Sequence, residues 1–291
     1  MPVFRQDLSG SLSPAAAILG PGLIGGSLAM ALRRGGVPWK VSLWTRRQES
    51  IAAAESALPG CRVSCDLASV VSGADIVVLC TSPHAIGRSG ELLAPLLPPG
   101  IPVTDAGSVK EQIVSALETA LGGRFIGAHP MAGSEQSGIR AARPDLYDGA
   151  LCILTPTENS DARALDAVRR LWTAAGCRLH EMPPAAHDAA VARVSHLPHA
   201  AAAALVRAAL GKCPEFSALA GSGYRDSTRI ACGPEDLWAE ILLDNRKEVA
   251  AGIADLQEHL EALKGTIARG DREGIEAFLK AARILREEET S

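Results

Sequence analysis

The chain has few aromatic residues and no strong excess of either charge. Phe, Trp and Tyr make up 3% of its 291 residues, and the formal net charge at pH 7 is −4. This balance leaves no basic surface of the kind that binds nucleic acid. Alanine supplies much of the 47% hydrophobic content, which favours helices that pack closely through small side chains.

Paired cysteines and long apolar runs are also missing. The seven cysteines are scattered, with no C-x-x-C pair, as is typical of a reducing compartment and not of a disulfide framework or a zinc site. The longest alanine-rich run, Ala200–Leu210, contains Arg207 and is too short to span a bilayer. The N-terminal residues are polar and acidic, unlike a secretory signal. We therefore expect a cytoplasmic protein without a metal centre or a membrane partner.

The first part of the chain alternates short apolar segments with amphipathic ones, from residue 15 to about 180. The expected strands are Ala17–Leu19, Lys40–Trp44, Ile76–Cys80, Pro102–Asp105, Phe125–His129, Ala150–Pro156 and Arg178–Met182. The expected helices are Gly25–Arg34, Gln48–Ala57, Asp66–Ser72, Lys110–Ala120 and Ser160–Ala175. This alternation predicts an α/β Rossmann-type domain with a mostly parallel sheet over residues 1–183.

After Pro183 and Pro184 the pattern becomes purely helical, which predicts an all-α C-terminal domain over residues 184–291. The expected helices are His187–Lys212, Pro234–Arg269 and Asp271–Glu288, with a broken connection over Gly211–Tyr224. An apolar stripe runs along the second of them, and three long helices seldom bury such a stripe alone. We therefore expect a homodimer through the helical domain; a monomeric helical cap is the alternative.

Three glycines at 20, 22 and 25 follow an apolar strand and open a helix, in the spacing G-x-G-x-x-G. The first allows a tight turn, the second lets the backbone approach a pyrophosphate, and the third lets helix and strand pack closely. The diphosphate of a dinucleotide is expected on the helix N-terminus, beside Leu23 and Ile24. The pattern predicts a nicotinamide cofactor site formed by Gly20, Gly22, Leu23, Ile24 and Gly25.

The end of the second strand indicates which nicotinamide cofactor is bound. Thr45, Arg46 and Arg47 stand where an NAD enzyme usually has an acidic residue, and the first carboxylate is Glu49. A hydroxyl beside guanidinium groups suits a 2′-phosphate, so we expect NADP in preference to NAD. A solvated basic turn is the alternative. We also assign to the cofactor the two residues that follow the strand Ile76–Cys80, which are Thr81 and Ser82.

Two loops at the carboxyl ends of neighbouring strands carry candidate catalytic residues. Ser108 follows one strand, and His129 lies between Ala128 and Pro130 at the end of the next. Open α/β sheets bind ligands at this edge. Although a lone histidine is more often structural, we expect His129 to be an acid–base group, with Ser108 bonding one ring nitrogen and fixing its tautomer.

The helical half adds candidate substrate ligands. Ser195, His196 and His199 surround Pro198, and the two histidines lie three residues apart on one helix face. With no third ligand at metal spacing, a polar substrate wall is the better interpretation. Arg225 and Arg229 lie in a glycine-rich segment, where arginine can hold a carboxylate. Arg229 is expected to be less exposed than Arg225.

Five motifs occur together in this order: Gly-Pro-Gly-Leu-Ile-Gly-Gly-Ser at 20–27, Asp-Ala-Gly-Ser-Val-Lys at 105–110, Gly-Ala-His-Pro-Met-Ala-Gly-Ser-Glu at 127–135, Ser-His-Leu-Pro-His at 195–199 and Arg-Asp-Ser-Thr-Arg-Ile at 225–230. In these motifs and their order the chain resembles the prephenate/arogenate dehydrogenase family of tyrosine biosynthesis. The resemblance implies oxidative decarboxylation of a cyclohexadienol, prephenate or arogenate, with hydride passing to the nicotinamide.

The resemblance also implies roles for single residues. His129 takes or shares the proton of the ring hydroxyl, Arg229 holds a substrate carboxylate, and Glu135 matches a position near the site. Family members that use NAD have aspartate where this chain has Thr45. Two other functions are weighed against this one: another NADP-dependent dehydrogenase with a Rossmann and a helical domain, and a protein that binds NADP without turnover. The sequence leaves prephenate and arogenate open.

Overall fold

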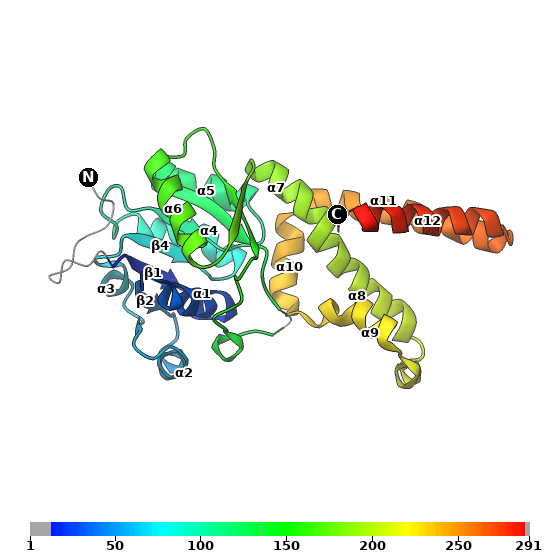
Figure 1. The fold of residues 1–291 in the computed structure, drawn as a ribbon, viewed down its shortest axis with the longest axis horizontal. Helices are drawn as coiled ribbons and strands as arrows, with labels where there is room; N and C mark the ends of the chain where they lie inside the picture. Colours follow the sequence, from blue (N-terminus) through cyan, green and yellow to red (C-terminus); the bar gives the residue numbers. More distant parts are fainter. Residues whose placement is uncertain (1–12, 135, 289–291) are drawn as a thin grey trace.

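The computed structural model describes residues 13–134 and 136–288, and its first part is built on one eight-stranded sheet (Figure 1). The strands are β1 Ala15–Leu19, β2 Lys40–Trp44, β3 Arg62–Ser64, β4 Ile76–Leu79, β5 Val103–Asp105, β6 Phe125–Pro130, β7 Leu151–Thr155 and β8 Arg178–Glu181. They lie in the order β3-β2-β1-β4-β5-β6-β7-β8. Only β6 and β7 pair antiparallel, so the expected mostly parallel sheet is confirmed. The edge strand β3, three residues long, is too short to show in the sequence pattern.

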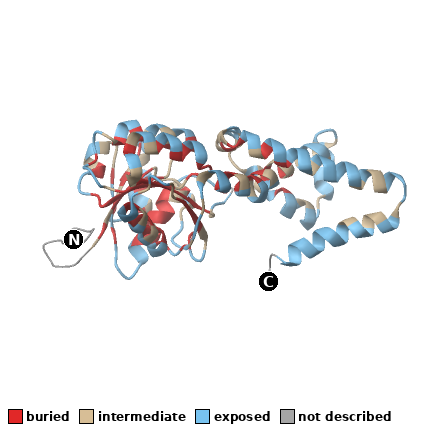
Figure 2. Ribbon diagram, turned by 90° about the horizontal axis from the view of Figure 1, so that it is seen from above, coloured by how far each residue is buried: buried red, intermediate tan, exposed pale blue. Residues whose placement is uncertain are grey.

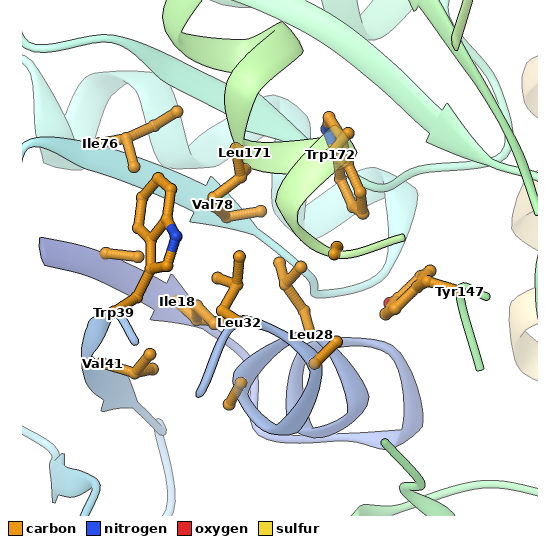
Figure 3. Packing of buried hydrophobic residues seen from close by; sticks show 14 of the residues in the cluster. Ile18, Leu28, Leu32, Trp39, Val41, Ile76, Val78, Tyr147, Leu171 and Trp172 are labelled. Atoms are coloured by element: carbon orange, nitrogen blue, oxygen red, sulfur yellow. The ribbon is translucent and has the colours of Figure 1, made fainter. Parts of the chain in front are cut away.

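Helices cover both faces of the sheet. They are α1 Leu23–Arg34, α2 Glu49–Ala57, α3 Leu67–Val71, α4 Pro83–Leu93, α5 Glu111–Leu121 and α6 Ala162–Ala174. Strand side chains alternate between the two faces: Ile18 and Val78 pack with α1 and α6 (Figure 3), and Ala17 and Val77 pack with α4 and α5. The sequence did not predict α4, because its two internal glycines weaken the helical pattern.

The order of the strands reverses between β1 and β4, which are neighbours in the sheet although β2 and β3 lie between them in sequence. Connections leave these two strands toward opposite sides, and the carboxyl ends of such strands form the ligand crevice of an open α/β sheet. The glycine-rich turn follows β1 and Thr81 follows β4. The fold thus brings the two segments expected to bind the cofactor to one edge of the sheet.

Helices alone make up the second part, as expected for residues 185–288. They are α7 Pro184–Val191, α8 Leu197–Leu210, α9 Ser222–Thr228, α10 Glu235–Asp244, α11 Arg246–Ala268 and α12 Arg272–Glu288, with a π-helical stretch Ala192–His196 and two short 3-10 segments, Pro214–Leu219 and Arg229–Cys232. The π-helical stretch runs directly into Pro198, which cannot donate to the carbonyl of Val194.

Two details of the helical part differ from expectation. The helix expected over Pro234–Arg269 is two helices that meet at Asn245, whose buried side chain donates to the carbonyl oxygen of Asp188 at 2.8 Å. The connection expected over Gly211–Tyr224 contains a 3-10 segment and the first turn of α9. Both differences come from tertiary packing that the helical period of the sequence does not encode.

The two parts meet along a narrow contact, and the far end of the helical part extends away from the sheet (Figure 1). Helix α7 packs against α5, and α10 packs against α4. The hairpin of α11 and α12 is mostly exposed (Figure 2), and no described residue of α12 is buried. Within the described ranges, no helix is long and apolar enough to cross a membrane.

Candidate functional site

The glycine-rich turn after β1 has the geometry of a dinucleotide-binding loop. Gly20 has φ +106°, and a Cβ there would lie 2.6 Å from the carbonyl oxygen of Cys80. A Cβ on Gly25 would lie 2.2 Å from the carbonyl oxygen of Gly20, so helix and strand can approach only without one. Gly22, the N-cap of α1, has open space around its Cβ position. The helix N-terminus is therefore open to an anion, and its first turn carries no acidic residue.

The residues expected to select the cofactor lie beside this turn. Trp44, the last residue of β2, accepts a hydrogen bond from the backbone N–H of Gly20 at 3.0 Å. Thr45 is buried, and its hydroxyl oxygen accepts a bond from the N–H of Arg47 at 3.4 Å. The side chains of Arg46 and Arg47 are exposed. The corner thus offers one ordered hydroxyl and two exposed guanidinium groups.

Thr81 and Ser82 close the other side of the turn. A methyl group of Thr81 would lie 3.1 Å from a Cβ on Gly20, so this residue touches the glycine-rich loop. Its hydroxyl oxygen is buried and has no hydrogen-bond partner within residues 13–134 and 136–288. Ser82 is the N-cap of α4. Both residues follow the carboxyl end of β4, beside the glycine-rich turn after β1.

His129 lies near the end of β6 and is 6% exposed. Its Nδ1 atom lies 2.8 Å from Nε2 of His187 in α7, and the two rings meet edge to face. Burial lowers the pKa of His129 well below its usual value, and the neighbouring His187, Lys110 and His196 lower it further. The imidazole is therefore neutral near pH 7 and able to accept a proton.

A fully buried ion pair holds the backbone just ahead of His129. The ammonium group of Lys110 donates to Oδ2 of Asp105 and, at 3.0 Å, to the carbonyl oxygen of Ala128. The N–H of Ala128 donates to the other carboxylate oxygen of Asp105 at 3.0 Å. The pair thus binds both polar groups of the residue before His129. The sequence places Asp105 and Lys110 in one motif but gives no sign of this role.

Ser108 lies half-buried in the loop between β5 and α5, but it is not the partner of His129 in this structure. Within the described ranges no hydrogen bond joins these two residues, and Nδ1 of His129 faces His187 instead. The sequence analysis missed His187 and its neighbour Asp188 as site residues. In the sequence they show only as a histidine followed by an acidic residue at the start of the helical part. Many helices contain such a pair.

His196 and His199, two of the residues expected to line the substrate site, both pack against Trp238. His199 stacks on the indole with ring centroids 3.4 Å apart, and His196 meets it edge to face at 6.2 Å. Both histidines are buried, and Ser195 is half-buried beside them. Burial lowers the pKa of His196 to about 4. In the described part of the chain, Nδ1 of His199 has no hydrogen-bond partner and is available to a polar ligand, whereas the imidazole of His196 faces the backbone of Ser108.

The arginines differ from expectation. Arg229 was expected to be less exposed than Arg225, but both side chains are exposed in the single chain. Arg229 begins a 3-10 segment that packs against α8, whereas Arg225 donates to the carbonyl oxygen of Ala220 at 2.7 Å. An apolar neighbour in sequence did not imply burial, because this short segment lies on the outside of the helical part. Glu135 lies outside the described residues.

Fold and site together define a two-domain dehydrogenase, with a dinucleotide-binding sheet joined to a helical part and a buried histidine between them. Family models agree. The nucleotide-binding domain of prephenate dehydrogenase matches residues 28–181, and its dimerization domain matches residues 183–281. The chain therefore belongs to the prephenate dehydrogenase family, whose members are oxidoreductases.

Individual relatives cover nearly the whole chain. The cyclohexadienyl dehydrogenase of Zymomonas mobilis is 32% identical, over 88% of this chain and 89% of that enzyme. A prephenate dehydrogenase of Aquifex aeolicus, solved with hydroxyphenyl propionate and NAD+, superposes with a TM-score of 0.88 at 36% identity, covering 94% of this chain and 98% of the other. Arogenate dehydrogenase of Synechocystis gives a TM-score of 0.79 at 32% identity, covering 94% and 99%.

Proposed function

We propose that this protein catalyses the NADP-dependent oxidative decarboxylation of prephenate, arogenate or both, yielding 4-hydroxyphenylpyruvate or tyrosine. The relatives named above act on these cyclohexadienols, and the chain carries the parts that the reaction needs. The observation that carries the proposal is His129: a buried, neutral imidazole at the ligand edge of the sheet, held on one nitrogen by His187. Its other nitrogen remains for the substrate.

The reaction balances with one base and one hydride acceptor. A nicotinamide held at the turn of Gly20, Gly22 and Gly25 would supply the hydride acceptor for the ring carbon that bears the hydroxyl group. His129 accepts the hydroxyl proton as the carbonyl develops. The ring carboxylate leaves as carbon dioxide, its electron pair makes the ring aromatic, and the proton returns from His129 to the phenol oxygen. Aromatisation makes the step strongly favourable, so the protein has mainly to orient the substrate and to hold one proton.

For the substrate we propose three groups of contacts. Ser195, His196 and His199 line the end of the site that receives the substrate side chain, because Nδ1 of His199 is buried there without a partner in the described part of the chain. Arg229 binds a carboxylate, with Arg225 nearby and Glu135 as a further polar contact that the family resemblance implies. Ser108, half-buried on the loop ahead of α5, contacts the ring hydroxyl together with His129.

For the cofactor we propose NADP over NAD. The support is the corner after β2, where Thr45 presents an ordered hydroxyl and Arg46 an exposed guanidinium, with no carboxylate before Glu49. A ribose diol has no acidic partner there, whereas a 2′-phosphate finds charge-assisted donors. The glycine-rich loop itself, with Gly20 and Gly25, fits either dinucleotide.

We further propose a cytoplasmic homodimer that forms through the helical domain, residues 184–291. Helices α11 and α12 expose Leu260, Ile267, Leu279 and Leu285 to between 55% and 70% in the single chain. The apolar stripe predicted from the sequence is buried only near its start, at Ile241 and Val249. A second copy would cover the rest. Sedimentation equilibrium should give twice the chain mass.

A direct assay tests the function. The purified protein is mixed with prephenate or arogenate and with NADP or NAD, and the absorbance of the reduced nicotinamide is followed. We expect turnover with at least one substrate, and a loss of about a hundredfold to ten-thousandfold in kcat for His129→Ala. Cofactor binding by calorimetry without turnover on either substrate would indicate a nucleotide-sensing protein and contradict the proposal.

A further inference from the structure

A chain of three buried side chains crosses from the helical part to His129. Asp188 and His187 are consecutive residues of α7, and Nδ1 of His187 lies 2.7 Å from Oδ1 of Asp188. On the opposite side of the same ring, Nε2 of His187 lies 2.8 Å from Nδ1 of His129. The side chains of His187 and Asp188 are 0% and 4% exposed. Both ring nitrogens of His187 are thus committed to protein partners.

Asp188 is fixed as a carboxylate by the first turn of α5. Its Oδ1 accepts the backbone N–H of Lys110 at 2.8 Å, and its Oδ2 accepts the N–H of Glu111 at 2.9 Å. Burial raises the pKa of Asp188, but the hydrogen bonds from His187, Glu111 and Lys110 outweigh burial and lower it. A helix N-terminus favours an anion at this point. The group therefore accepts hydrogen bonds and donates none.

The charge of Asp188 determines where the protons of both imidazoles lie. Because the carboxylate only accepts, His187 carries its proton on Nδ1. Burial is the largest effect on the pKa of His187 and lowers it, so the ring is neutral and its Nε2 holds a lone pair. That lone pair needs a donor, and among the residues that the structure describes the Nδ1–H of His129 supplies it. His129 then has its own lone pair on Nε2, the atom that remains for the substrate.

We propose that His187 and Asp188 are positioning residues for the catalytic base: they hold His129 in the Nδ1–H tautomer and stabilise the imidazolium that forms when it takes the substrate proton. This inference rests on the proposed function for the chemistry of His129 but not for the geometry of the chain. It assigns to the helical part a share in the acid–base step, in addition to any substrate contacts. Lys110, Asp105 and His196 are the other titratable groups that face this pair.

Kinetics of two variants test the proposal. His187→Leu removes the acceptor for His129, whereas His187→Gln keeps a carbonyl oxygen near the position of Nε2. We expect His187→Leu to lower kcat by about tenfold to a hundredfold with KM within about twofold. The reason is that proton transfer to His129 needs the Nδ1–H tautomer and a stabilised imidazolium, whereas substrate binding does not. His187→Gln should recover most of that loss. Asp161→Ala, which removes the N-cap of α6 away from the site, controls for general destabilisation and should leave kcat unchanged.

Nitrogen-15 NMR of the histidine side chains gives a reading independent of turnover. In the wild-type protein, His129 (assigned with the His129→Ala variant) should be protonated on Nδ1, and in His187→Leu the tautomers should mix. A wild-type His129 protonated on Nε2 would overturn the proposal even if the leucine variant fails to fold. So would a kcat of His187→Leu within about threefold of wild type. Absence of turnover in the wild type would instead refute the proposed function. The measured tautomer of His129 would still test whether His187 and Asp188 position it.

Discussion

At the scale of single residues, the site depends on groups whose charges are buried and paired. Lys110 and Asp105 are both 0% exposed, and together they bind the N–H and the carbonyl oxygen of Ala128. Such a pair contributes little net stability compared with apolar side chains, but removal of one member leaves a charge in a low-dielectric interior. The pair therefore fixes the geometry next to His129.

Lys110→Met should destabilise the protein by about 3–5 kcal/mol, because Asp105 would remain buried without its cation. The double variant Lys110→Met/Asp105→Asn should recover part of this loss, since no charge is then left unpaired. Urea unfolding of both proteins measures the effect. Equal stability of the single and double variants would show that the unpaired carboxylate is not the cause.

Arg46→Ala should lower the preference for NADP over NAD, measured as the ratio of kcat/KM values, by about tenfold to a hundredfold. The reason is that a charge-assisted hydrogen bond to the 2′-phosphate contributes about 1.5–3 kcal/mol. Arg163→Ala, an exposed arginine at the start of α6, removes the same charge elsewhere and should leave the ratio unchanged. An unaltered ratio in Arg46→Ala, or equal use of both cofactors by the wild type, would exclude Arg46 as the discriminator.

At the scale of elements, two glycines of the turn between β1 and α1 have different roles: Gly25 serves the packing of helix on strand, and Gly22 leaves space for a ligand. Gly25 allows the helix to approach the strand, because a Cβ there would overlap the carbonyl oxygen of Gly20. Gly22 meets no protein atom within 4 Å of its Cβ position, and its backbone is extended, with φ −90°. The space beside it is left for a ligand, not for packing.

Alanine should therefore affect stability at Gly25 and cofactor binding at Gly22. Gly25→Ala should lower the free energy of unfolding by about 1–3 kcal/mol through overpacking, whether or not cofactor is present. Gly22→Ala should fold with near wild-type stability and weaken cofactor binding, because its methyl group occupies the space that the pyrophosphate approaches. Thermal denaturation and calorimetric titration with NADP separate the two. Unchanged NADP affinity in Gly22→Ala would place the pyrophosphate elsewhere.

At the scale of the whole molecule, four buried histidines gather where the sheet meets the helical part. They come from β6, α7, the π-helical stretch and α8, and burial lowers the pKa of each: His129, His187, His196 and His199. This junction carries the site, so the conditions that protonate the histidines also act on the contact between the two parts.

The protein should become less stable as the pH falls below about 6.5, the ordinary pKa of histidine in an unfolded chain. The folded-state pKa of His196 is about 4, so between these values the unfolded chain binds a proton that the folded chain does not. Each such histidine lowers the free energy of unfolding by about 1.4 kcal/mol per pH unit in this range. Urea unfolding at several pH values should show this slope in the free energy of unfolding. In His196→Asn the slope should be smaller by the contribution of close to one proton. A flat profile from pH 6.5 to 5 would contradict it.

Local patterns in the sequence determined the class of fold, the cofactor turn and the position of His129. The glycine spacing, the strands that precede it and the helical period act between residues close together in the chain, so they can be recognised without the structure. Even there, short or glycine-containing elements such as β3 and α4 were missed, since too few residues repeat the pattern.

Only the tertiary structure decided what surrounds His129. Its partner His187 lies 58 residues away in sequence, and Asp188 reaches the backbone of Lys110 across 78 residues. The same packing put Arg229 on the outside and turned Nδ1 of His129 toward His187. Contacts of this kind depend on how α7 docks against α5, and docking is set by the summed shape and burial of many side chains. No spacing within one segment encodes it.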